Sequence, residues 1–83
     1  MDFTDHIKRI SLNIRTIRKQ EKLTIQEVAY RCDIERSNLS RIEAGKSNLT
    51  IKTIFQISEA LGVTFDDIVV GKRYTEEFPN KKP

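Results

Sequence analysis

The centre of the sequence carries the start and stop signals of two short helices separated by a tight turn. Thr24 and Glu27 stand three residues apart, the spacing at which two side chains form a capping box at the start of a helix. Asp33 interrupts this first helix, because aspartate tolerates a left-handed backbone better than most residues that carry a side chain. A second helix is expected over residues 36–44, and Gly45 follows it in the position that glycine favours after a helix.

The second helix is too polar to be a buried strut. Its only strongly apolar residues are Leu39 and Ile42, which stand three apart. Two short helices joined by a short turn, with the second one polar, have the outline of a helix-turn-helix. This unit runs from Thr24 to Glu43. In such a unit the first helix rests against the DNA backbone and the second lies in the major groove.

The polar residues of the second helix have the chemistry that base recognition requires. An arginine can form two hydrogen bonds to guanine N7 and O6, and an asparagine can do the same with adenine. Serine hydroxyls both donate and accept, and an arginine one turn further along reaches a base or a phosphate from the same face. The predicted base-contacting residues are Arg36, Ser37, Asn38, Ser40 and Arg41.

Two neighbouring segments are predicted to hold phosphates. The start of the first helix offers free backbone N–H groups and the positive end of the helix dipole, and Thr24 and Gln26 add side-chain donors there. Lys46, Ser47 and Asn48 follow the second helix directly. They are expected to contact the flanking DNA backbone.

A stripe of isoleucines predicts a longer helix before this unit, over residues 4–22, with Thr4 or Asp5 as its cap. The stripe, at spacings of three and four, consists of Ile7, Ile10, Ile14 and Ile17. A fourth helix is expected over residues 51–61 after Thr50. A last short helix begins after Thr64, with Asp67 in the capping-box position.

These patterns predict an all-α fold, a compact bundle of five helices without strands. The expected domain covers residues 1–71. Residues 72–83 are polar, end in proline and lack periodicity, so they are interpreted as a tail. Tyr74 and Phe78 are the two residues of this tail that favour docking against another surface.

Composition excludes several classes of protein. No apolar run is long enough to cross a bilayer, and the N-terminal residues lack the apolar core of a secretory signal. The single cysteine, Cys32, rules out an internal disulfide and a Cys-rich zinc site and is interpreted as a small core residue. The expected location is the cytoplasm.

The charge is unevenly distributed. Residues 15–46 hold eight basic residues against five acids, whereas residues 47–71 hold Lys52 against three acids. A basic half beside an acidic half suits a protein that faces nucleic acid on one side. Charge alone fits an ordinary solvated surface equally well.

Catalytic constellations are lacking in the sequence. His6 has no second residue at metal-ligand spacing, so it is assigned to the surface or to N-terminal packing. Asp66 and Asp67 stand in the first turn of a helix, where acidic residues are favoured by the helix dipole. Without a Gly-rich loop or a Ser/His/Asp set, neither enzyme activity nor a metal or cofactor is expected.

The stretch TIQEVAYRCDIERSNLSRIEAGKSNLTIKTIFQISEALGV resembles the DNA-binding domain of phage repressor and Cro proteins, also called Xre-type regulators. The resemblance covers about residues 12–70 and rests on the patterns L-T-x-x-E-x-A, S-x-I/L-S-R-I-E-x-G-K-S-N and a helix ending A-L-G-V. A shorter likeness, over Asn48–Lys52, is to the controller proteins of restriction–modification systems. The resemblance implies a five-helix bundle that binds duplex operators as a homodimer.

The resemblance assigns the same base-contacting and backbone-contacting positions, and it adds a structural ion pair between Arg18 and Glu43. Three residues depart from the family pattern. Ile25 stands where glutamine is usual, Asp33 where glycine is common, and Glu35 where serine, threonine or aspartate opens the second helix. Glu35 repels phosphate but can accept a hydrogen bond from cytosine N4.

The expected function is therefore a sequence-specific regulator of transcription, a repressor that binds a pseudo-palindromic operator as a homodimer. Its dimer surface is expected on the last helix and the loop before it, with Tyr74 and Phe78 of the tail as candidate additions. One alternative is the antitoxin of a toxin–antitoxin pair that represses its own operon. Another is a protein-interaction module that kept the fold but lost DNA binding, against which the basic residues of the second helix argue.

Overall fold

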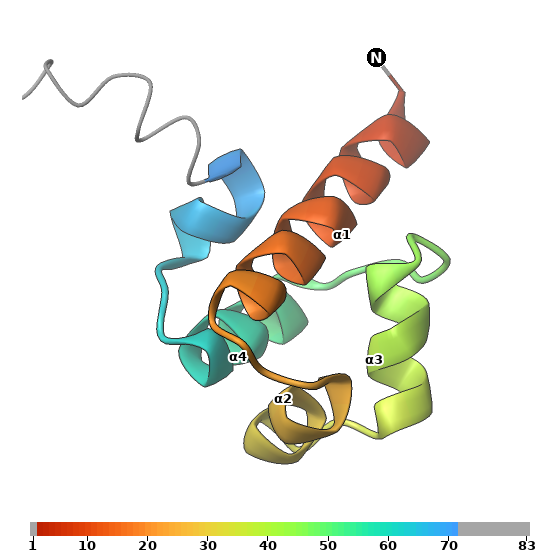
Figure 1. The fold of residues 1–83 in the computed structure, drawn as a ribbon. Helices are drawn as coiled ribbons and strands as arrows, with labels where there is room; N and C mark the ends of the chain where they lie inside the picture. The colour runs from red at the N-terminus through yellow and green to blue at the C-terminus, as the bar shows by residue number, and fades with distance from the viewer. Residues whose placement is uncertain (1, 72–83) are drawn as a thin grey trace, which may run out of the picture.

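The structure, a computed structural model, describes residues 2–71, and all of its regular elements are helices. Within that range there is no strand, which confirms the predicted all-α fold of five helices. Figure 1 shows a long α1 crossing the molecule with the four shorter elements packed around it. Tyr74 and Phe78 lie outside the described residues. The elements are α1 (Phe3–Gln20), α2 (Ile25–Cys32), α3 (Arg36–Glu43), α4 (Ile51–Leu61) and η1 (Asp67–Gly71).

The start of α1 lies earlier than predicted. Asp2, and neither Thr4 nor Asp5, is the cap, because its extended backbone lets its carboxylate accept a hydrogen bond from Asp5 N–H at 3.0 Å. The Asp5 carboxylate in turn accepts a hydrogen bond from the Asp2 backbone N–H, so the two acids form a capping box. The predicted end was also wrong, since Lys22 is left-handed with φ 60°.

Each helix of the central unit is followed, within two residues of its end, by a left-handed residue. Asp33 has φ 58° and ψ 42°, and the following Ile34 N–H donates to the Ala29 carbonyl at 3.0 Å. Gly45 has φ 75°, and Lys46 N–H donates to the Arg41 carbonyl at 3.0 Å. These six-residue closures satisfy carbonyls at the helix end. The interruption predicted at Asp33 is confirmed.

The core takes one fully buried apolar side chain from every element. These side chains, all at 0% exposure, are Ile14, Val28, Leu39, Ile57 and Ile68. Cys32 packs into the same cluster, as its predicted core role requires. A shared core of this kind makes the position of α3 depend on all the other elements.

The last element begins as predicted but is wound differently. Thr64 and Asp67 exchange the two hydrogen bonds of a capping box, yet Asp67–Gly71 form a π-helix. The Asn13 side-chain amide of α1 donates to the Ile68 carbonyl at 2.8 Å. This bond fastens the wider turn of η1 to α1, a contact that no sequence pattern indicates.

Within residues 2–71 no helix is long and apolar enough to cross a membrane. The same part of the chain holds no cluster of three or more histidine, cysteine, aspartate or glutamate residues placed to bind a metal ion.

Ser11 is buried at 2% exposure, and its hydroxyl has no hydrogen-bond partner among the described residues. An unsatisfied buried hydroxyl costs about 1–3 kcal/mol. We therefore expect Ser11→Ala to raise the free energy of unfolding by about 1 kcal/mol or more in a urea titration. Ser40→Ala, on an exposed part of α3, measures the gain from helix propensity alone. An equal gain in both variants would show that the Ser11 hydroxyl carries no such cost.

Candidate nucleic-acid interface

A buried ion pair fixes α3 against α1. Arg18 Nε lies 2.7 Å from Glu43 Oε2, and Arg18 Nη2 donates to Glu43 Oε1 at 3.0 Å. The third guanidinium nitrogen, Nη1, donates to the Leu23 carbonyl at 2.8 Å. One guanidinium thus joins α1, the segment before α2 and the end of α3. Because Glu43 is 9% exposed and paired twice, it is withdrawn from the surface that faces solvent.

The inward face of α3 is small, so most of the surface of this helix is open to solvent. Leu39, Ile42 and Glu43 are its buried residues. In Figure 1, α3 stands at the edge of the molecule with one side uncovered. The residues predicted to contact bases are all exposed there: Arg36, Ser37, Asn38, Ser40 and Arg41. The structure therefore leaves all five open to solvent.

The N-terminus of α2 presents donors that the helix itself does not use. Thr24 Oγ1 accepts from Glu27 N–H at 3.0 Å, and the Glu27 carboxylate accepts from Thr24 N–H at 2.8 Å. The next two amides, of Ile25 and Gln26, have no acceptor within the helix. Thr24 itself is exposed beside these amides. The Gln26 side chain is exposed at this end.

Glu27 brings a negative charge to the same helix end. The hydrogen bonds from Thr24 hold the pKa of the Glu27 carboxyl below its ordinary value. The carboxylate is therefore ionised near neutral pH, and it accepts the capping-box hydrogen bond from Thr24 N–H. Any attraction for a phosphate at this point comes from the free amides and the helix dipole.

The second predicted phosphate segment lies beyond the other end of α3. Lys46 and Asn48 are exposed and Ser47 is half-buried. In Figure 1 this loop lies at the upper end of α3, while α2 packs beside the lower part of the helix. The loop after α3 and helix α2 thus lie near opposite ends of α3.

The two remaining departures from the family pattern have structural consequences. Ile25 is half-buried and packs against the core, so it adds packing where glutamine would add a polar group. Glu35 stands at the N-cap of α3 with an extended backbone but makes no side-chain capping bond. The start of the recognition helix is consequently uncapped by any side chain.

Replacing Glu35 with serine is expected to raise the free energy of unfolding by about 1 kcal/mol, because a serine hydroxyl at this position accepts a bond from a free amide of α3. The same change removes a negative charge from the start of α3, so we also expect non-specific affinity for duplex DNA to rise. Thermal unfolding and a duplex titration measure the two effects. Glu35→Ala is the matched control, since it removes the charge without adding a cap. Equal stability of the two variants would contradict the capping argument.

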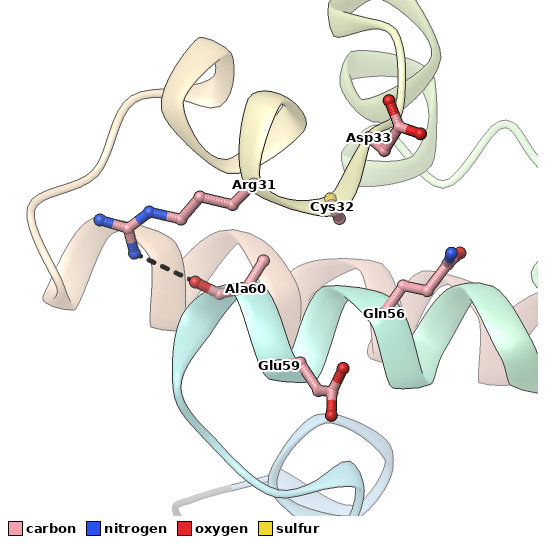
Figure 2. A pocket seen from close by; sticks show the side chains of 6 residues that line it. All are labelled: Arg31, Cys32, Asp33, Gln56, Glu59 and Ala60. Atoms are coloured by element: carbon pink, nitrogen blue, oxygen red, sulfur yellow. Dashed lines mark hydrogen bonds between the residues drawn. The ribbon is translucent and has the colours of Figure 1, made fainter.

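A pocket of about 450 Å³ lies between the C-terminal end of α2 and α4. Figure 2 shows Arg31 reaching across its rim, where Nη1 donates to the Ala60 carbonyl at 3.1 Å. Arg31 therefore caps the C-terminal end of α4. The Cys32 thiol beside it donates to the Val28 carbonyl, and burial raises its pKa above the ordinary value. This thiol is held as a neutral packing group.

Two short helices at a fixed angle, a polar second helix and a buried brace behind it define a helix-turn-helix protein. Residues 14–68 match the model of the family described as Helix-turn-helix. The chain belongs to this family, which confirms the resemblance to Xre-type regulators.

Individual relatives agree with the family assignment. An uncharacterized HTH-type transcriptional regulator, y4dJ of Sinorhizobium fredii, is 32% identical over 90% of this chain and 94% of its own length. The immunity repressor protein of Bacillus phage phi105 is 33% identical over 72% of this chain, which spans 42% of that longer protein. The controller protein C.Esp1396I, solved as a tetramer in complex with its natural 35 base-pair operator, is 29% identical. The match to that structure has a TM-score of 0.73 and covers 84% of this chain and 93% of that one, which confirms the predicted likeness to restriction–modification controllers.

Proposed function

We propose that this chain is a transcriptional regulator that binds specific duplex DNA through the exposed face of α3. The observation that supports the proposal most strongly is that one side of α3 is buried and the other is polar and exposed. Its apolar residues and Glu43 are buried, whereas its outer face presents hydrogen-bonding side chains alone. Such a face has the dimensions and chemistry of a helix that reads the major groove.

The proposed contacts divide by chemistry. Arg36 and Asn38 form paired hydrogen bonds to base edges, with Ser37, Ser40 and Arg41 supporting them from the same face. The DNA backbone on one side of the major groove is bound by Thr24, Gln26 and the free amides of α2. The backbone on the other side is bound by Lys46, Ser47 and Asn48. Phosphate contacts fix the register, and base contacts supply the sequence preference.

We further propose that the protein binds as a homodimer on a pseudo-palindromic operator. Large apolar side chains remain exposed on the C-terminal half of the fold, namely Ile51 at 75%, Phe55 at 51% and Val70 at 46%. They extend the predicted dimer surface from η1 onto α4. The tetrameric assembly of C.Esp1396I on its operator supports self-association. Half-sites would then lie about one helical turn, roughly 34 Å, apart.

Repression is the outcome that this small protein achieves most directly. A dimer seated in the major groove occupies its operator and excludes other proteins from the same bases. The similarity to a phage immunity repressor supports this assignment, and a DNA-bound regulator of this kind acts in the cytoplasm.

Selection of bound duplexes from a random pool tests the proposal. We expect enrichment of a two-fold symmetric site whose half-sites are centred 10–10.5 base pairs apart or a multiple of it. Affinity for that site should fall steeply with salt, and Lys46→Ala should lower the salt slope by about 0.9 for each protomer bound. A protein-interaction module would enrich no sequence and would bind DNA with little salt dependence.

A further inference from the structure

Helix α1 turns different flanks toward its two neighbours. Asn13 lies on the flank that binds η1, through its bond to the Ile68 carbonyl. Arg18 points toward α3 through its ion pair with Glu43. Since a helix turns by about 100° per residue, Lys8 projects about 80° from Arg18 and about 140° from Asn13. Lys8 therefore belongs to the α3 side of the helix.

The stem of Lys8 rests on the residue that terminates α3. A methyl group built on Gly45 would lie 3.4 Å from Lys8 Cγ and 3.8 Å from Lys8 Cα. Gly45 immediately precedes Lys46, and both lysines are exposed. The α1 backbone thus places the stem of a second exposed lysine at the same end of α3 as Lys46, although the two residues are far apart in sequence.

Among the described residues, Lys8 forms no ion pair with an acidic side chain. Within residues 2–71 the single ion pair is that of Arg18 with Glu43. Glu43, at the end of α3, is saturated by that guanidinium. Asp5, one turn before Lys8 on α1, accepts the Asp2 backbone N–H in the capping box. An exposed lysine without an acidic partner is free to bind an external anion.

We propose that Lys8 is a further phosphate-binding residue, which holds the DNA backbone together with Lys46 at the C-terminal end of α3. The proposal rests on the DNA-binding function argued above and adds a contact from α1 to it. A lysine that neutralises one phosphate releases about one counterion, and so adds about 0.9 to the salt slope of binding. The contact strengthens binding to any sequence and leaves base preference unchanged.

The test compares full-length Lys8→Gln, Lys8→Arg and Arg9→Gln with the wild type. Arg9 is the matched control, because it is an exposed cation on the same helix but projects about 100° further round, away from α3. Affinity for a random-sequence 20 base-pair duplex is measured by fluorescence anisotropy between 50 and 200 mM salt. Circular dichroism verifies that each variant is folded.

We expect Lys8→Gln to lower the slope by about 0.9 per bound protomer, so that its deficit relative to wild type shrinks about threefold across this salt range. Lys8→Arg should keep the wild-type slope, and Arg9→Gln should change it much less than Lys8→Gln. Equal slopes for Lys8→Gln and Arg9→Gln would overturn the Lys8 contact while leaving the proposed function intact. A wild type without salt-dependent binding would overturn both.

Discussion

Replacing Glu43 with alanine is expected to lower the free energy of unfolding by about 3–5 kcal/mol. The change strands the Arg18 guanidinium, which is 8% exposed, without the carboxylate that accepts from two of its nitrogens. Breaking a buried pair from one side is costly because the remaining charge stays desolvated. For a chain of this size, such a loss approaches the whole stability of the fold. Chemical denaturation followed by circular dichroism measures it.

A double substitution separates the cost of a stranded charge from the loss of packing. Arg18→Met with Glu43→Leu replaces both partners by apolar side chains of similar size, and we expect it to recover most of the stability lost in Glu43→Ala. If Glu43→Ala unfolds at the same denaturant concentration as wild type, the pair does not brace α3 and this account of the site is wrong.

Arg36→Ala is expected to reduce discrimination between the selected operator and a scrambled duplex by about 1–3 kcal/mol per half-site, or about 5- to 150-fold. Arg36 is exposed on α3, and its side chain makes no hydrogen bond or ion pair within residues 2–71, so the fold should be unaffected. Competition binding with both duplexes measures the change. Lys52→Ala, an exposed cation on α4, should leave discrimination unaltered. Arg36→Ala that binds the selected site as tightly as wild type would show that another residue reads the base.

The elements that short-range signals specify were predictable from the sequence. The capping box of Thr24 and Glu27, the left-handed Asp33 and the stop at Gly45 each depend on residues a few positions apart. The start of α1 was misplaced because two acids three residues apart, Asp2 and Asp5, both suit a cap and only the backbone at Asp2 decides between them. The π-helical winding of η1 depends on packing against α1, which no local pattern encodes.

Some features of the candidate site could likewise be predicted from the sequence, and others depend on contacts between distant residues. The polar face of α3 is visible in the sequence because few of its residues are apolar, and the structure places that face in solvent, while its contact with bases stays a prediction. The contacts of Lys8 and Arg31 could not be predicted from the sequence, for a common reason. Their roles depend on Gly45 and Ala60, residues distant in sequence that only the folded chain brings near.

We propose that the surface formed by α3, the start of α2 and the loop after α3 binds duplex DNA. Amide chemical shifts recorded during titration of the labelled protein with the selected duplex test it most directly. We expect the largest changes over residues 24–26, 36–41 and 46–48, with saturation at one duplex per dimer and reversal by added salt. Changes confined to α4 and η1, or none at salt concentrations that permit binding of other helix-turn-helix proteins, would contradict the account.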